Sequence, residues 1–123
     1  MNNSSYQDLK IWQQSIEAGL KLYRKLGTFP HYEQFALCNQ MRRCIISIPS
    51  NIAEGHARNT NKEFLHFLSI SRGSIAELQT QILFSIELNY LDRKFGEELS
   101  YCYNGIDVMI KNLMTSIKKK NNK

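Results

Sequence analysis

Apolar residues recur along most of the chain at alternating steps of three and four, the spacing that places side chains on one face of an α-helix. The pattern divides into four stretches that we expect to be helical, over residues 5–26, 30–55, 60–88 and 93–117. No stretch alternates apolar and polar residues long enough to predict a β-strand. Four helices of this length with short connections predict an all-α fold, an antiparallel up-down-up-down four-helix bundle.

Each stretch has an apolar seam that we expect to face the core of the bundle. The seam of the first stretch consists of Leu9, Trp12, Ile16, Gly19, Tyr23 and Leu26. The second seam consists of Leu37, Met41, Cys44, Ile45, Ile48 and Ile52. The third consists of Phe64, Leu68, Ile75, Leu78, Ile82 and Ile86, and the fourth of Leu99, Tyr103, Ile106, Ile110, Leu113 and Ile117.

Capping residues, glycines and a proline mark the expected helix ends. Ser4–Gln7 and Thr60–Glu63 have the spacing of capping boxes, and Gly27 stands where the first helix should end. Pro30 suits the first turn of the second helix, where its missing N–H needs no partner. Gly73 lies inside the third stretch, where glycine costs about 1 kcal/mol relative to alanine, so we expect another backbone to pack closely there.

Pro49 stands inside the second apolar seam. A proline ring clashes with the carbonyl of the residue four positions earlier, here Ile45, so we predict a helix that is kinked at Pro49 but not broken. The neighbouring Ser47, Ser50 and Asn51 carry side chains that bond to backbone carbonyls lacking an N–H partner. We interpret this polar group as structural, with a place in a functional surface as the alternative.

Most of the positive charge sits at the end of the chain. Lys and Arg number 16 against 11 Asp and Glu, a formal net charge of +5. Four of the lysines fall in the last six residues, so residues 1–117 carry 12 positive charges against 11 negative ones. We expect a bundle domain over residues 1–117 and a basic disordered tail over 118–123, which either solubilises the chain or attracts polyanions.

Composition excludes several other classes of protein. Three cysteines without a C-x-x-C pair do not form a disulfide framework or a zinc-finger spacing. No apolar run approaches the length of a membrane span, and the first residues have no signal-peptide pattern. We therefore expect no membrane association and a cytoplasmic location.

Several runs of residues resemble the motifs of one bacterial family. They are Tyr6–Leu9 with Trp12, Phe35–Leu37, Gln40–Arg43, the run Ser47–Gly55 followed by Arg58, and Gly73–Gln81. The chain is on these grounds similar to the four helix bundle protein family, also called ribosomal-RNA intervening-sequence proteins. The family fold is also similar to that of the accessory protein of diversity-generating retroelements. Cys44 and Ile45 depart from the family pattern, which has a small residue there, but both are apolar.

The resemblance implies an antiparallel four-helix bundle that assembles into a ring, as a homopentamer. It also implies association with RNA or DNA, and partners such as a reverse transcriptase or a ribosomal component. It implies no catalytic residues, so we predict that the protein is not an enzyme and has no cofactor.

Two groups of residues invite a chemical interpretation. Glu63 and His66 have the Glu-x-x-His spacing of di-iron bundles, but the second such pair is missing, so we favour a solvated or partly buried histidine over a metal site. Cys38, Cys44 and Cys102 are candidate nucleophiles, but a reactive cysteine needs a base or a cationic setting. We favour small core residues for them.

Basic residues are the remaining candidates for a binding site. Arg42 and Arg43 are adjacent, so at most one of them can face the core, and Glu54 and Arg58 can pair across the expected turn after residue 55. The candidate nucleic-acid-binding residues are Lys21, Arg24, Lys25, Arg42, Arg43, Arg58, Lys118, Lys119 and Lys120. Without an RNA-recognition signature, binding would use phosphates or shape.

The leading hypothesis is therefore a non-enzymatic, oligomeric accessory protein that binds structured RNA, ribosomal RNA or a ribonucleoprotein. The alternative is a protein–protein scaffold with no nucleic-acid role, and the third is a metal-dependent bundle enzyme. Apolar residues expected on outer faces suit contacts between subunits. They are Phe67, Ile70, Tyr90 and Tyr101.

Overall fold

The computed structural model describes residues 5–121, which form four α-helices and two short 3-10 helices. The α-helices are α1 (Lys10–Leu26), α2 (Leu37–His56), α3 (Asn61–Glu87) and α4 (Arg93–Asn121). The 3-10 helix η1 (Tyr6–Asp8) precedes α1, and η2 (His31–Glu33) precedes α2. The all-α class and the four-helix bundle predicted from the apolar periodicity are confirmed.

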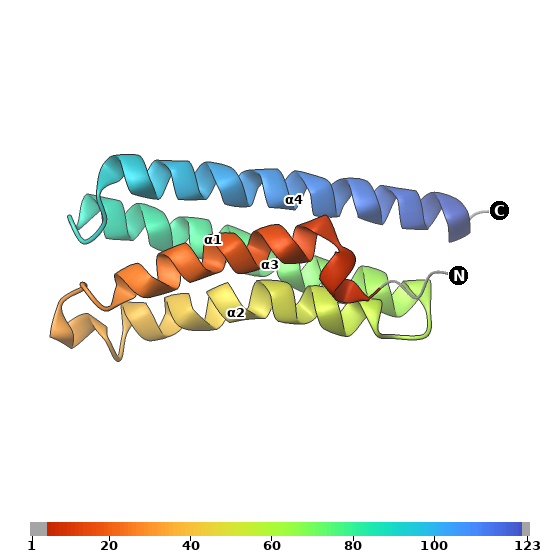
Figure 1. Cartoon of the computed structure of the whole chain (residues 1–123), viewed down its shortest axis with the longest axis horizontal. Coiled ribbons are helices and arrows are strands. Elements are labelled where there is room, and N and C mark those ends of the chain that lie inside the picture. The colour runs from red at the N-terminus through yellow and green to blue at the C-terminus, as the bar shows by residue number, and fades with distance from the viewer. Residues whose placement is uncertain (1–4, 122–123) are drawn as a thin grey trace.

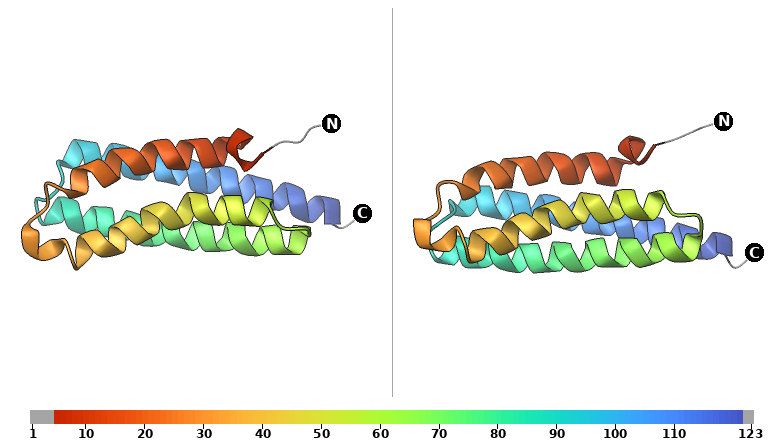
Figure 2. Two further views of the ribbon diagram at one scale, coloured as in Figure 1. Left: turned by 60° about the horizontal axis from the view of Figure 1, so that its bottom comes forward. Right: turned by 90° about the horizontal axis from the view of Figure 1, so that it is seen from below.

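Consecutive helices run back and forth along the long axis of the molecule (Figure 1). Each helix packs against its neighbours in the order α1, α2, α3, α4, and α4 packs against α1 to close the bundle. Two further views show the same arrangement, with both ends of the chain at one end of the bundle (Figure 2). The connection between α1 and α2 lies at the opposite end.

The core fills the space between the four helices. Tyr103 of α4 is its largest fully buried side chain. The predicted seams of α2, α3 and α4 supply most of the other buried residues, so the periodicity of these three helices was read correctly. They include Met41, Ile48, Ile52, Leu68, Ile75, Leu78, Ile82, Ile106 and Ile110.

The predicted seam of α1 is correct at Gly19 and Leu26, which are buried, but not at its other residues within the helix. The buried residues of α1 are Ile11, Ser15, Ala18, Gly19, Leu22 and Leu26. Two predicted seam residues, Trp12 and Ile16, are only half-buried, and Tyr23 is 40% exposed. The reason is that α1 carries two adjacent apolar lines, and the line that faces the core includes Ser15, whose hydroxyl donates to the Trp12 carbonyl at 2.8 Å.

Helices α1 and α2 begin later than predicted. Ser5 and Asp8 form the capping box, at η1, and α1 begins at Lys10, while Ser4 lies outside the described residues. Pro30 caps η2 instead of starting α2, which begins at Leu37. The intervening segment is held as a connector because Gln34 donates to the Leu26 carbonyl at 2.8 Å and to the Phe29 carbonyl at 3.2 Å. At α3 the predicted cap is present, because the Thr60 hydroxyl accepts from the backbone N–H of Glu63.

Helix α4 continues to Asn121, past the predicted end of the bundle at residue 117. Lys118, Lys119 and Lys120 therefore lie on the last turn of this helix, and residues 122–123 of the predicted tail lie outside the described residues. Lysines at this position interact favourably with the negative end of the helix dipole, which supports the extension.

Hydrogen bonds from polar side chains surround Pro49, which is buried inside α2. Asn51 Nδ2 donates to the Ser47 carbonyl at 2.8 Å, and Ser71 Oγ of α3 donates to the Ile48 carbonyl at 2.9 Å. The Ser47 and Ser74 hydroxyls pair at 2.9 Å. These bonds reach the carbonyls of Ser47 and Ile48 and not that of Ile45, which the proline leaves without its N–H partner, and they link α2 to α3.

The close helix approaches lie at other glycines than the predicted one. A Cβ at Gly73 would meet nothing within 4 Å, so the expectation of close packing there is wrong. A Cβ at Gly19 would lie 2.9 Å from Ile45 Cγ2, and one at Gly55 would lie 2.8 Å from Phe67 Cβ. Gly55 therefore does not end α2, which runs to His56, but lets α3 approach it.

Candidate nucleic-acid interface

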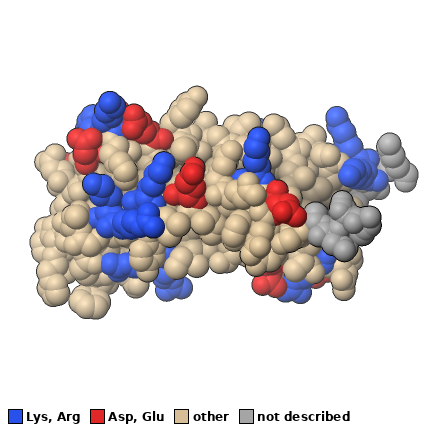
Figure 3. All heavy atoms as spheres, viewed as in Figure 1, with Lys and Arg blue, Asp and Glu red and all other residues tan. Residues whose placement is uncertain are grey.

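The predicted basic residues lie at the two ends of the bundle. Lys21, Arg24 and Lys25 stand on the C-terminal half of α1, where Lys and Arg side chains gather on the surface (Figure 3). Arg42 and Arg43 lie on the first half of α2, the neighbouring helix at the same end. We call these five residues the basic end. The remaining candidates, Arg58 and Lys118–Lys120, lie at the opposite end of the bundle.

The α1 part of the basic end is exposed. Lys25 Nζ lies 5.4 Å from the centre of the Phe95 ring on α4, a cation–π contact that holds the lysine against the bundle. Within residues 5–121, Lys21 and Arg24 form no ion pair. Their charges are therefore available to an external anion.

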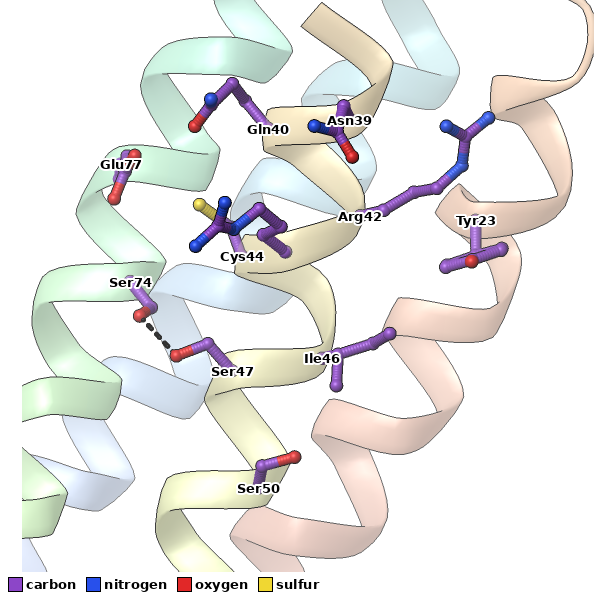
Figure 4. A pocket seen from close by; sticks show the side chains of 11 residues that line it. Tyr23, Asn39, Gln40, Arg42, Cys44, Ile46, Ser47, Ser50, Ser74 and Glu77 are labelled. Carbon is purple, nitrogen blue, oxygen red and sulfur yellow. Dashed lines mark hydrogen bonds between the residues drawn. The ribbon is translucent and has the colours of Figure 1, made fainter. Parts of the chain in front are cut away.

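An open pocket of about 790 Å³ lies on the outer face of α2, between α1 and α3 (Figure 4). Arg42 points from α2 toward Tyr23 of α1, while Ser74 and Glu77 of α3 line the other side (Figure 4). The remaining lining residues belong to α2: Asn39, Gln40, Arg43, Cys44, Ile46, Ser47 and Ser50. The pocket thus combines two guanidinium groups with hydroxyl and amide groups and with the carboxylate of Glu77.

The two adjacent arginines have different surroundings. Arg42 is half-buried, donates to the side-chain and backbone oxygens of Gln34, and lies 5.9 Å from the centre of the Tyr23 ring. Arg43 is exposed and, in the part of the chain that the structure describes, forms no hydrogen bond or ion pair. The expectation that at most one of the pair faces inward is confirmed, and Arg43 is the one with a free charge.

Arg58 is surrounded by acidic residues. Its guanidinium lies 2.7 Å from Glu54 and 3.5 Å from Glu63, so the predicted pairing of Glu54 with Arg58 is confirmed. It also lies 5.0 Å from the centre of the Phe67 ring. Two carboxylates offset its charge, and the three groups together join the end of α2 to the start of α3.

Ion pairs set the other arginines of α3 and α4 apart from the basic end. Arg72 of α3 pairs with Asp107 of α4 at 2.8 Å, and Arg93 pairs with Glu87 at 2.7 Å and with Glu97 at 3.4 Å. The arginines on α1 and α2 up to residue 43 have no such carboxylate within the described residues. Among the described residues, the arginines without a carboxylate partner therefore lie on α1 and α2, while the exposed Lys118–Lys120 at the opposite end form no ion pair either.

The three cysteines and the Glu-x-x-His pair differ in their surroundings. Burial raises the pKa of the Cys44 thiol to about 11, with a smaller contribution from the nearby Glu77 charge. Burial also raises the pKa of Cys38, but Cys102 is exposed, so the prediction of a small core residue is wrong for Cys102. Within residues 5–121, no group of three or more His, Cys, Asp or Glu side chains is placed to hold a metal ion. No described helix is long and apolar enough to cross a membrane.

The residues predicted for subunit contacts are only partly exposed. Ile70 is 38% and Tyr101 80% exposed, in line with the prediction. Tyr90 is instead half-buried, with its hydroxyl donating to Glu33 at 2.9 Å, and Arg58 covers Phe67. The rings of Tyr90 and Phe67 are therefore occupied by contacts within the chain. The sequence analysis missed an exposed apolar group on the last turns of α3, formed by Leu83, Phe84 and Leu88.

The fold defines the class of the protein, an all-α four-helix bundle, and its described arginines without a carboxylate partner lie on α1 and α2. The chain matches the 23S rRNA-intervening sequence protein family over residues 7–112 and belongs to this family, as the sequence motifs indicated. No curated protein matches it.

The fold is similar to the crystal structure of a protein of unknown function from Bacteroides thetaiotaomicron, assigned to the S23 ribosomal protein family. The TM-score is 0.76 at 20% sequence identity, and the match covers 85% of this chain and 97% of the other. At this identity the likeness shows a common fold.

Proposed function

We propose that the protein is a non-enzymatic accessory protein that binds structured RNA by its phosphates, through the basic end. The observation that carries the proposal is the contrast in ion pairing between the two sets of arginines. Arg58, Arg72 and Arg93 are each neutralised by a carboxylate, while Arg24 and Arg43 are not. Unpaired cations on neighbouring helices attract polyanions, and the family name supports RNA as the polyanion.

The chemistry of the basic end favours recognition of phosphates over recognition of bases. Lys21, Arg24 and Arg43 are long side chains on helix surfaces, and they reach outward from two different helices. Such contacts fix the position of a nucleic acid without reading its sequence. Binding should therefore weaken steeply as salt is added.

We further propose that the chain acts as a homo-oligomer, a homopentameric ring in the arrangement that the family resemblance implies. The exposed apolar group Leu83, Phe84 and Leu88 supports association, because such groups on a helix surface are favourable to bury. In a ring the basic end is repeated in each subunit, so weak contacts from several subunits add to one affinity.

The experiment is the binding of a fluorescein-labelled RNA hairpin, followed by fluorescence anisotropy over a series of salt concentrations. The test variant combines Lys21→Glu, Arg24→Glu and Arg43→Glu. The matched control combines Lys118→Glu, Lys119→Glu and Lys120→Glu, which makes the same change of charge at the opposite end. The slope of log K against log salt is negative. We expect its magnitude to be smaller by about 2 to 3 in the test variant, since each lost phosphate contact contributes about 0.7 to 0.9.

Two results would contradict the proposal. Equal losses in the two variants would mean that the RNA responds to total charge and not to the basic end. Unmeasurable binding of the unaltered protein near physiological salt would remove the nucleic-acid role altogether.

A further inference from the structure

The α1–α2 connector, residues 27–36, carries exposed aromatic side chains at the same end of the bundle as the basic end (Figure 1). Phe35 is 83% exposed, the largest exposed fraction among the described large apolar side chains, and Tyr32 is 72% exposed. The phosphate contacts proposed above use neither ring. Two rings this exposed within one connector form an aromatic surface whose faces have no role in the fold.

Hydrogen bonds hold the connector, and with it the two rings, against the bundle. The Tyr32 hydroxyl pairs with the Tyr90 hydroxyl at 3.1 Å, and Tyr90 in turn engages the carboxylate of Glu33 at 2.9 Å. Phe35 directly follows Gln34, whose side chain donates to the last carbonyl of α1 at 2.8 Å. Because the connector is already ordered, little conformational entropy is lost when a ligand packs on its rings.

Cations lie next to this aromatic surface. The guanidinium of Arg42 donates to the backbone carbonyl of Gln34 at 3.2 Å, so it lies beside the residue that precedes Phe35. The side chain of Gln34 also ties the connector to the end of α1, and the last turn of that helix carries Arg24 and Lys25. The exposed rings and the cations of the basic end are therefore neighbours on one surface.

This combination of flat rings and neighbouring cations indicates the kind of ligand. Proteins that bind single-stranded nucleic acids stack the bases on aromatic rings and hold the backbone with cations. Stacking tolerates every base, because each base has a π face. An apolar protein surface would need the rings but not the cations. In a paired stem the bases lie inside the stack, so only unpaired nucleotides present a free base face to the rings.

We propose that the rings of Phe35 and Tyr32 stack on unpaired bases of the bound RNA. The ligand is then an RNA with an unpaired loop or bulge, and not a fully paired stem. The stacking adds affinity to the phosphate contacts of the basic end without reading the base sequence. This inference rests on the proposed function, because it names the kind of RNA that the basic end binds.

The probes are two fluorescein-labelled RNAs with the same number of phosphates. One is a hairpin with a long unpaired loop, and the other is a blunt duplex in which every base is paired. Both are titrated by fluorescence anisotropy over a series of salt concentrations. Phe35→Leu keeps an apolar side chain but removes the ring, whereas Phe35→Tyr keeps the ring. Tyr101→Leu is the matched control, because Tyr101 is 80% exposed on α4 and lies outside the connector.

We expect the unaltered protein to bind the hairpin about tenfold or more tightly than the duplex. Phe35→Leu should weaken binding of the hairpin by about fivefold or more and leave binding of the duplex unchanged. Phe35→Tyr and Tyr101→Leu should bind both RNAs like the unaltered protein. The slope of log K against log salt should stay the same in Phe35→Leu, because stacking releases no counterions.

Tyr32 is tested in the same way. Tyr32→Leu should weaken binding of the hairpin by about fivefold or more, as Phe35→Leu does. Tyr32→Phe keeps the ring and removes only the hydroxyl that pairs with Tyr90, so it should bind the hairpin like the unaltered protein. Equal losses in the two variants would mean that the hydroxyl bond and not the ring is what binding needs.

Several results would overturn the inference. Equal affinity for the hairpin and the duplex, with a steep salt slope, would remove the stacking and leave the phosphate proposal standing. Full affinity of Phe35→Leu for the hairpin, or an equal loss in Tyr101→Leu, would also remove it. So would a smaller oligomer for Phe35→Leu in sedimentation velocity, because Phe35 would then contact a second copy of this chain. Binding of neither RNA would overturn the proposed function and this inference with it.

Discussion

Gly55 of α2 and Phe67 of α3 lie so close that a Cβ on the glycine would be 2.8 Å from the Cβ of the phenylalanine. The same added atom would lie 3.0 Å from Phe64 Cδ1 and 3.3 Å from the Phe64 carbonyl oxygen. Neither the Phe67 Cβ nor a backbone carbonyl can move without moving α3. The short connection between α2 and α3 thus depends on the absence of a side chain at Gly55.

Gly55→Ala should lower the free energy of unfolding by about 1 to 3 kcal/mol, because the methyl group forces α2 and α3 apart. Gly73→Ala is the matched control, since a Cβ there meets nothing within 4 Å and glycine is unfavourable inside a helix. This control should raise the free energy of unfolding by about 0.5 to 1 kcal/mol. Urea unfolding followed by circular dichroism measures both, and equal effects of one sign would refute the packing argument.

Arg72 and Asp107 should stabilise the contact between α3 and α4. Arg72 Nε and Nη2 donate to the two carboxylate oxygens at 2.8 Å and 3.3 Å, and the bonds raise the pKa of Arg72. A double-mutant cycle with Arg72→Met and Asp107→Asn should give a coupling of about 0.5 to 1 kcal/mol, because both groups are partly exposed. The exposed pair Arg93 and Glu97 serves as the control, with a smaller expected coupling.

Replacing Arg42 by methionine should mainly affect stability, whereas replacing Arg43 by methionine should mainly affect RNA binding. Arg42→Met removes the bonds to Gln34 and should lower the free energy of unfolding by about 1 kcal/mol. Arg43→Met should change it by less than about 0.5 kcal/mol but weaken RNA binding. Gln34→Ala should reproduce the stability loss of Arg42→Met. A stability loss for Arg43→Met would mean that this guanidinium also has an internal role.

The buried Cys44 thiol should make the stability of the protein fall at alkaline pH. Its pKa is about 11 in the folded chain and has the ordinary value of 9.0 in the unfolded chain. Above pH 9 the unfolded thiol loses its proton while the folded thiol keeps it, so the unfolded state gains stability until about pH 11. The contribution of Cys44 is thus fully present below pH 9 and is lost as the pH rises toward 11.

Urea unfolding between pH 8 and pH 11 tests this dependence with Cys44→Ala, and with Cys102→Ala as the control, since Cys102 is exposed. The fall above pH 9 should be shallower in Cys44→Ala by up to about 1.4 kcal/mol per pH unit. Identical pH profiles for the two variants would contradict the burial argument for Cys44.

The fold followed from the apolar periodicity because the apolar lines predicted for α2, α3 and α4 are the ones that face the core, although α3 also carries exposed apolar residues such as Leu83 and Phe84. Helix α1 carries two apolar lines, and the sequence alone does not say which of them faces the core. The core line contains Ser15 and Ala18, which are smaller and less apolar than Trp12 and Tyr23 of the other line. Ser15 is buried at little cost because its hydroxyl bonds to its own helix. The second line of α1 instead lines an apolar groove between α1 and α2.

The sequence predicted which residue types form the candidate site, but not which residues of the chain these side chains contact. Arg42 and Arg43 are adjacent, and adjacent residues on a helix point in different directions. The sequence therefore indicated that at least one of the two is exposed. The choice between them depends on Gln34, which lies in a connector whose path no periodicity predicts. In contrast, Glu54 and Arg58 were recognised as a pair because four residues separate them.

Both ends of the described chain lie at the same end of the bundle, away from the connection between α1 and α2 (Figures 1 and 2). A fluorescent domain or affinity tag fused to either terminus therefore stands far from Arg43 and the α1–α2 connector. For the same reason, a short linker can join the two ends to give a circularly permuted chain, opened at the connector before α2. Such a chain keeps all four helices, but its new ends lie beside the basic end. A tag or a second domain can then be attached next to the basic end.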